Sequence, residues 1–310
     1  MPIGAPVVRD PLNSISRGIA ALDIPDDPLL RLAALDDESR KHRHVPEWDG
    51  PNAVVTREKS LEFRRKTFIR EWEEGLSILR QLAQQAPDFR PHWLDSDVPA
   101  AWQADQFLHA YYYNEVVDGA RHPFEEHYQK NRADPARAVA AALGWWSGLK
   151  EPPSGEDYNC HVRAPVIRQC LTRKNLETLT QENFIQVCQA NHSTADHVGR
   201  MNLNDFGLEV SAETSWEDRI TAFSQWIWAR RNRRDERIDK VLAYVLDGGP
   251  TREIPSRLFE AANNPERKIP HFGTNQIAEI AGWARPEVCA PRNGRTSKSL
   301  RALGYDVRIY

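Results

Sequence analysis

The chain has 310 residues, of which 40% are hydrophobic, and a formal net charge of -3. No run approaches the roughly 18–20 apolar residues that a membrane-spanning helix requires, so we expect no membrane partner. The first ten residues, Met1 to Asp10, lack a charged flank followed by an apolar core, so no signal peptide is visible and a cytoplasmic location is expected.

The N-terminal half divides into an arm and a helical region. Residues 1–55 are rich in Pro, Asp and Arg and hold only short apolar runs, which predicts an extended arm. Beyond them, apolar residues recur at three- and four-residue steps, as amphipathic helices require. The helical segments predicted in this region are 56–82, 95–111 and 135–149. The sequence Pro152-Pro153-Ser154-Gly155 is the clearest linker signal, so we predict a helical N-terminal extension at 56–152.

The C-terminal half, 156–310, is also predicted to be helical, and the chain as a whole to be all-α. Thr180, followed by Glu182 and Asn183, is typical of a helix start. The segments that fit helices are 162–171, 177–190, 193–201, 216–231 and 235–246. Few segments alternate with the two-residue period of a strand. A basic run lies at the end of the segment 216–231 and just beyond it: Arg230, Arg231, Arg233 and Arg234.

The segment from Ile269 to Ile280 predicts a tight hairpin between two short helices. Pro270 and an obligatory Gly273 would form the turn, and the second helix would begin directly after that glycine. The first N–H groups of a helix have no intrahelical partner, so such an end can bind a phosphate without any side chain. The hairpin residues expected to contact DNA are His271, Phe272, Gly273 and Thr274. An ordinary glycine turn is the alternative interpretation.

A basic helix is predicted after this hairpin. The segment 293–304 reads as a loop that enters a helix, with Arg295 and Lys298 in its first turns. From Glu266 to Tyr310 there are eight Lys or Arg and four Asp or Glu, so 8 minus 4 gives +4 in this region. Local positive charge on a slightly acidic protein suits a partner that one face contacts, and double-stranded DNA is the partner we predict. Solvated helix faces would account for the charge equally simply.

Together the hairpin and the basic helix resemble the helix-hairpin-helix DNA glycosylase superfamily, the endonuclease III and adenine-glycosylase group. In that family a hairpin of the form Leu-Pro-Gly-Val-Gly is followed after a fixed gap by an aspartate and a helix. Asn275 falls where bifunctional members carry a Schiff-base lysine, and Asn293, 18 residues later, falls on the catalytic aspartate. Lys298, Leu300 and Gly304 match the helix that follows.

A weaker match lies upstream and extends the resemblance over roughly 165–310. The stretch 184–194 resembles the family's early helix, which ends in a turn that pushes a polar side chain into the gap left by a flipped base. Asn191 or His192 would be the equivalent here. The chain departs from the family at His271, which replaces the first hairpin glycine, and at Asn293. The four-cysteine iron–sulfur loop of many relatives is absent.

The resemblance implies base excision from DNA by base flipping. Flipping brings the glycosidic bond within reach and costs least for damaged or modified bases. Asn293 cannot supply the negative charge that usually stabilises the oxocarbenium-like transition state, but it could orient a water and hold the leaving base. With Asn275 in place of the lysine, a Schiff-base lyase step is not expected, so the predicted enzyme is a monofunctional glycosylase with Asn293 and Asn275 in its catalytic site.

The N-terminal half has no counterpart in the core family and carries many aromatic residues, among them Trp102, Tyr111, Tyr112, Tyr113, Trp145 and Trp146. These fall within helical periodicity and suit a helix core; alternatively, they could form a pocket for a bulky base. In outline the chain resembles bacterial phage-defence glycosylases that excise glucosylated hydroxymethylcytosine, which would make antiviral defence its role.

Two functions remain open at this level. One is the monofunctional glycosylase. The other is a non-catalytic module that binds modified DNA within a restriction or defence system, with Asn293 marking a lost active site. The cysteines Cys160, Cys170, Cys188 and Cys289 show no zinc-ribbon spacing and are expected to be reduced thiols. We predict no metal site and no cofactor.

Overall fold

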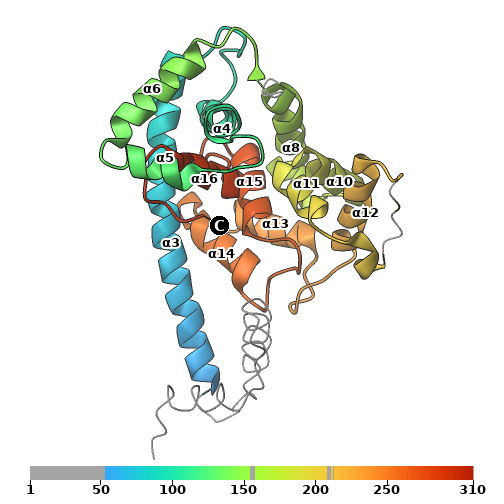
Figure 1. Ribbon diagram of the computed structural model, residues 1–310. Coiled ribbons are helices and arrows are strands. Elements are labelled where there is room, and N and C mark those ends of the chain that lie inside the picture. The colour runs from blue at the N-terminus through green and yellow to red at the C-terminus, as the bar shows by residue number, and fades with distance from the viewer. Residues whose placement is uncertain (1–52, 154–157, 208–210, 212, 310) are drawn as a thin grey trace, which may run out of the picture. The chain divides into compact units, whose positions relative to one another are not determined.

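The computed structural model describes residues 53–153, 158–207, 211 and 213–309. The described chain is mainly helical, which confirms the all-α prediction at that level (Figure 1). Nearly all of the predicted arm at 1–55 lies outside these residues. No helix among the described residues combines the length and apolarity needed to cross a membrane.

The chain forms two compact units, Met1–Ser60 and Leu61–Tyr310, and apart from the first residues of α3 everything below concerns the second. The predicted boundary at 152–156 falls inside this second unit. The described elements, in chain order, are α3 (Ala53–Gln85), η1 (Ala86–Phe89), α4 (Ala100–Tyr111), η2 (Tyr112–Val116), α5 (Phe124–Asn131), α6 (Pro135–Ser147), η4 (Asn159–Arg163), α8 (Ala164–Cys170), α9 (Arg173–Glu177), α10 (Gln181–Ala190), α11 (His192–Gly199), η5 (Leu203–Phe206), α12 (Trp216–Trp228), α13 (Ile238–Asp247), η6 (Thr251–Glu253), α14 (Ile254–Asn263), α15 (Thr274–Ala284) and α16 (Gly294–Ala302).

Several helices begin where the sequence supplies a capping side chain. Thr180 accepts a hydrogen bond from the backbone N–H of Asn183 at 3.2 Å, which confirms the helix start predicted there. Ser215 caps α12 and Asp134 caps α6 in the same way. Each cap satisfies one of the backbone donors that a helix leaves free at its start, so local sequence alone sets these boundaries.

One hydrophobic core runs through the second unit and includes residues from both predicted halves. The helix α4 lies in the middle of it and contacts η1, η4, α6, α15 and α16, and Figure 1 shows it end-on among its neighbours. Trp102 of α4 donates a hydrogen bond to the carbonyl of Gly282 in α15 at 3.3 Å. The N-terminal helices therefore pack directly against the hairpin helix.

The aromatic residues of the N-terminal half mostly belong to this core. Trp146 has no exposed surface, and Trp102 and Tyr112 are 4% and 2% exposed. Tyr111 is also buried, whereas Tyr113 is 38% exposed. Their placement fits the helix-core interpretation and leaves Tyr113 as the residue of the three consecutive tyrosines that reaches solvent.

Candidate active site and nucleic-acid interface

The predicted hairpin is formed by α14, a loop and α15. The loop closes with an antiparallel bridge between Ile269 and Phe272, and the N–H of Phe272 donates to the carbonyl of Ile269 at 3.2 Å. Proline at the second position and a positive φ at the third are typical of a type II turn, and here Pro270 is followed by His271 with φ of 66°. The hairpin is thus a tight turn that leads into a helix.

The conformational demand falls on His271 and not on Gly273. Gly273 has φ of -109°, which any residue can adopt, and a Cβ placed there would have open space around it. The expectation of an obligatory glycine at this position is therefore wrong, because the left-handed backbone lies two residues earlier. His271 is exposed, whereas Phe272 is 1% exposed and packs against Phe184 in the core.

The start of α15 is accessible. Gly273 precedes the helix, its N–H donates to the side chain of Gln276 at 2.9 Å, and Thr274 and Asn275 lie half-buried in the first turn. The structure places Asn275 at this end of the helix, one turn before Glu279. These positions are compatible with a phosphate at the first-turn N–H groups.

Asn293 is buried and caps α16. Its Oδ1 accepts a hydrogen bond from the backbone N–H of Thr296 at 2.9 Å, and its Nδ2 donates to Glu279 at 3.0 Å. The side chain is 4% exposed. Both polar atoms of Asn293 therefore have protein partners, so the arrangement fits a side chain that orders the site better than one that holds a water and a leaving base.

Glu279 accepts hydrogen bonds from several donors although it is only 1% exposed. The backbone N–H groups of His192 and Ser193 donate to its carboxylate at 2.9 and 3.0 Å, and the Ser193 hydroxyl donates to it as well. Asn293 and the indole of Trp283 complete the set. Two of these donors are first-turn N–H groups of α11, a helix end that favours negative charge.

This environment keeps Glu279 ionised. Burial raises its pKa, but the positive charge of Arg295 and the hydrogen bonds from Ser193 and Asn293 outweigh burial, so the pKa of Glu279 is lowered. Arg295, a predicted DNA contact, is half-buried on α16, and its guanidinium lies over the ring of Tyr113 at 5.7 Å. One of its terminal nitrogens, Nη1, is buried and has no hydrogen-bond partner among the described residues.

Asn191 and His192 have different surroundings. Asn191 has no exposed surface and caps α11, with its Oδ1 accepting from the N–H and hydroxyl of Thr194, each at 2.8 Å. That inward orientation does not suit insertion into a DNA gap. The His192 side chain is 31% exposed, and its Nε2 lies 3.5 Å from Asp196. Of the two, His192 is the residue whose side chain could reach a ligand.

A second buried carboxylate, Asp105 of α4, lies close to the first. Burial raises the pKa of Asp105 to about 7, against the opposing charge of Arg295. The hydroxyl of Thr296 lies 3.2 Å from Asp105 Oδ1 and 3.2 Å from Asn293 Oδ1. Since Asn293 also bonds to Glu279, a continuous chain of hydrogen-bonding groups joins the two carboxylates. One carboxyl is ionised and the other titrates near neutrality.

Two π-helices border the cluster formed by Glu279, Asp105, Asn293 and Arg295. Such helices are rare in proteins, and many of those known lie at functional sites. The first, η2, supplies Tyr113, whose ring lies 4.9 Å from that of His109. The second, η4, supplies Arg163, whose charge acts on His109 and His192. The two histidine rings lie 5.8 Å apart, and burial lowers the pKa of both. Both histidines are therefore neutral at neutral pH.

A cleft of about 510 Å³ opens beside the cluster. His192 and Arg163 belong both to the cluster and to the lining of this cleft. Trp216, at the start of α12, also lines it and is 49% exposed. His192 thus links Glu279, which accepts a hydrogen bond from its backbone N–H, to an accessible cavity that its side chain lines.

The structure brings Asn293, Arg295 and His192 together around Glu279, and it places Lys298 elsewhere, with its ammonium 5.7 Å from the ring of Phe124. Sequence reasoning missed Asp105. The sequence indicates only that a carboxylate lies in a predicted helix whose other residues are mostly apolar or uncharged. Its burial could be inferred only from the packing of α16 against α4.

The hairpin, the capped helix α16 and the 18-residue spacing between Asn275 and Asn293 are the features that resemble the helix-hairpin-helix glycosylases. Their geometry is compatible with that resemblance, which stays a prediction. No family model, no curated protein and no solved structure matches this chain.

Proposed function

We propose that the protein is a monofunctional DNA glycosylase that excises a modified base from double-stranded DNA. One observation carries the proposal: a single helix, α15, joins the hairpin to the buried carboxylate. Glu279 lies six residues after Gly273, which corresponds to about 9 Å along the helix axis. A strand whose phosphate bound the helix start would therefore be held at a fixed distance from the two carboxylates.

The chemistry suits two carboxyl groups whose pKa values lie apart. Hydrolysis breaks the bond between C1′ and the base, the base leaves with the electron pair, and a water oxygen bonds to C1′. Ionised Glu279 would stabilise the positive charge that develops on the sugar. Asp105, with a pKa of about 7, would accept the proton that the water releases. Solvent would protonate the departing base.

In this proposal the roles of the asparagines differ from those inferred from sequence. Asn293 is a positioning residue, since it holds Glu279 through Nδ2 and the start of α16 through Oδ1. Asn275 offers no amine, so the reaction would end at an abasic site without strand cleavage. We propose phage DNA with glucosylated hydroxymethylcytosine as the substrate, and antiviral defence in the cytoplasm as the role.

The test is base release from duplex DNA that carries glucosylated hydroxymethylcytosine, compared with unmodified duplex, with alkali revealing abasic sites as strand breaks. We expect breaks only with modified DNA and only after alkali. Glu279→Gln and Asp105→Asn should each lower the rate by about 100-fold or more, the scale of losing one well-placed charged or proton-transferring group. Asp97→Asn, a change at an exposed residue, is the matched control and should leave the rate unchanged.

A second function, non-catalytic binding of modified DNA, is favoured by one specific observation. Asp105, Glu279 and Asn293 are 3%, 1% and 4% exposed, and Glu279 already accepts hydrogen bonds from several protein groups. A saturated, buried carboxylate is also what a purely structural helix cap would show. Tight binding of modified duplex without any base release in the wild-type protein would favour this module over the enzyme.

A further inference from the structure

We infer that a second basic element, the turn between α12 and α13, binds the phosphodiester backbone of duplex DNA beside the hairpin. This turn, called here the arginine turn, comprises residues 230–237. The inference rests on the proposed function for its partner, and it adds a binding surface that the hairpin alone does not provide.

The arginine turn is ordered by one buried side chain, Asn232, which is 9% exposed. Its Oδ1 accepts hydrogen bonds from the N–H groups of Arg234 at 3.0 Å and Glu236 at 2.9 Å. Its Nδ2 donates to the carboxylate of Glu236 at 2.9 Å and to the carbonyl of Arg267 at 2.8 Å. Arg267 belongs to the hairpin loop, so Asn232 fixes the arginine turn directly to the hairpin.

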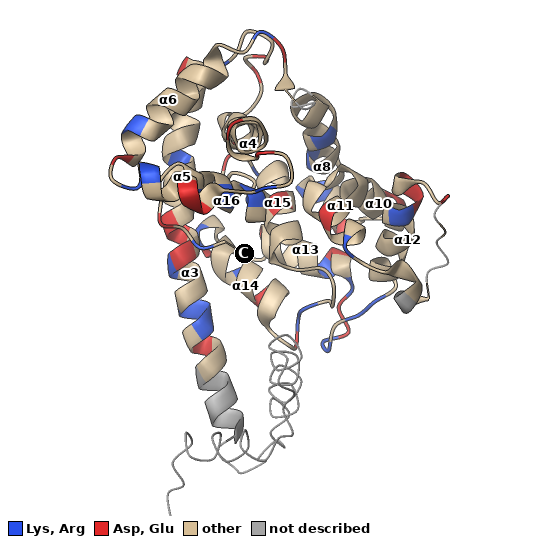
Figure 2. Ribbon diagram, in the orientation of Figure 1, with Lys and Arg blue, Asp and Glu red and all other residues tan. Residues whose placement is uncertain are grey.

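The surface that results is positively charged. Its exposed cations are Arg230, Arg231, Arg233, Arg234 and Lys268. Two exposed acids, Asp235 and Glu266, oppose them, so 5 minus 2 gives +3. Figure 2 shows Lys and Arg gathered on the loops next to α13. Asp235 lies 3.6 Å from Arg231 and Glu266 lies 3.3 Å from Arg233, so these two arginines are partly neutralised.

Three cations remain for an external anion. Arg234 and Lys268 form no ion pair among the described residues. Arg230 lies over the indole of Trp226 at 4.2 Å, which restricts the side chain without neutralising its charge. Cations that are held in place before binding lose less entropy when a ligand arrives.

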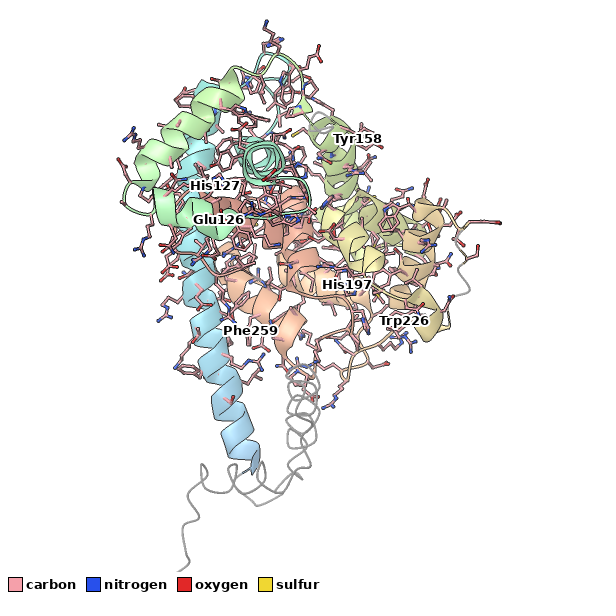
Figure 3. All side chains as sticks on the ribbon, viewed as in Figure 1. Glu126, His127, Tyr158, His197, Trp226 and Phe259 are labelled. Carbon is pink, nitrogen blue, oxygen red and sulfur yellow. The ribbon has the colours of Figure 1, made fainter. Side chains whose placement is uncertain are left out.

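The same surface continues to the hairpin turn. Trp226 packs edge-on against His271 at 5.7 Å, and His271 lies 5.8 Å from the ring of His197. Figure 3 labels Trp226 and His197, which project from α12 and α11 in the same region of the unit. Since His271 belongs to the hairpin turn that leads into α15, the cations and the start of that helix belong to one face.

The phosphate backbone fits this face better than an acidic protein does. Guanidinium groups form paired hydrogen bonds with phosphate oxygens, and a helix start adds N–H donors for a further phosphate. Two such elements, fixed to one another through Asn232, match a partner that presents phosphates at regular spacing. Carboxylates of an acidic segment would not need that fixed spacing.

The test compares two charge-matched triple variants. One is Arg230→Gln, Arg234→Gln, Lys268→Gln; the other is Arg132→Gln, Arg137→Gln, Lys150→Gln, whose exposed cations lie around α6, away from the arginine turn (Figure 1). Fluorescence anisotropy with an unmodified 20-base-pair duplex would give affinity against salt. Each lost phosphate contact should flatten the slope by about 0.9, so the first variant should lose about 2.7 and the second nothing. Between 50 and 200 mM salt, wild-type affinity should then fall roughly 40-fold more than that of the first variant.

Two further proteins separate the inference from the proposed function. Asn232→Ala leaves every charge in place but frees the arginine turn, and it should flatten the slope in the same direction, with circular dichroism checking that the protein is folded. Gly273→Asp should weaken binding through the hairpin. If Gly273→Asp weakens binding while the first triple variant binds as the wild type does, the inference is overturned and the hairpin stands. Equal binding of poly-glutamate and DNA by the wild type would also overturn it, in favour of an acidic protein. If the wild-type protein binds no duplex at any salt concentration, both the inference about the arginine turn and the proposed function are refuted.

Discussion

The buried carboxyl of Asp105 makes a sharp prediction about stability and pH. Its pKa is raised from 3.8 to about 7 in the folded protein, mainly by burial. Below about pH 4 the carboxyl is protonated in both the folded and the unfolded protein, so its raised pKa does not change the free energy of unfolding. As pH rises from about 4 to about 7, the unfolded chain ionises this group and the folded protein does not, so wild-type stability falls over that window.

The size of the effect follows from the shift. A difference of about 3 pKa units at about 1.4 kcal/mol each corresponds to roughly 4 kcal/mol of lost stability above pH 7. Asp105→Asn removes the ionisation and keeps the shape of the side chain. Some hydrogen bonding to Thr296 or Gln106 is lost, which costs about 1 kcal/mol at every pH. We therefore expect the variant to be slightly less stable than wild type at pH 4 and about 3 kcal/mol more stable at pH 8.

The assay is urea unfolding of both proteins at pH 4, 6 and 8, with stability extrapolated to water. Asp97→Asn serves as the control because it makes the same replacement at an exposed residue. If the difference between Asp105→Asn and wild type were the same at all three pH values, Asp105 would not titrate in this window. The assignment of proton transfer to it would then fail.

Three other predictions concern the frame around the site. A Cβ on Gly282 would lie 2.1 Å from the backbone nitrogen of Pro291, so the two segments would have to separate by 3.4 minus 2.1, or 1.3 Å. Gly282→Ala should therefore destabilise the protein by about 3 kcal/mol in urea unfolding, whereas Gly144→Ala, with open space around its Cβ, should stabilise it by about 0.5–1 kcal/mol; equal stability of the two variants would contradict this packing. Asn293→Asp replaces the hydrogen-bond donor to Glu279 by a second carboxylate and should lower the free energy of unfolding by about 2 kcal/mol or more. An unchanged urea midpoint for this variant would show that the hydrogen bond does not stabilise the protein. Borohydride should trap no covalent protein–DNA adduct, because Asn275 has no amine, and a trapped adduct on a gel would refute the monofunctional mechanism.

The helices were largely predictable because their signals are local. Each helical segment predicted from apolar spacing contains a helix, for example α6 at Pro135–Ser147 within the predicted 135–149. Thr180 and its Asn183 fixed one boundary through a single hydrogen bond. Such features depend on residues three or four apart, and these are visible in the sequence.

The site was only partly predictable because it depends on contacts between distant segments. The spacing of Asn275 and Asn293 led to Asn293, but nothing in that spacing indicates that its side chain is buried against Glu279. Asp105 lies 191 residues from its partner Thr296. An aspartate on a predicted helix normally faces solvent, and here it is buried because α16 packs against that face. The turn glycine was misassigned because the left-handed residue is His271, and a positive φ is uncommon for any residue other than glycine.

The burial of this cluster bears on which of the two functions the chain performs. Burying a charged carboxylate costs several kcal/mol unless its surroundings compensate, and Glu279 has full compensation from its donors and from Arg295. A structural helix cap could explain Glu279 but not Asp105, whose ionisation the fold opposes. In a module that only binds DNA, Asp105→Asn would raise the stability at neutral pH and leave DNA binding unchanged. In an enzyme, the same variant would be more stable but would lose the group that accepts the proton. Stability and base release measured on Asp105→Asn should therefore move in opposite directions if the site is catalytic, because groups held at an unfavourable ionisation are typical of sites where that ionisation is used.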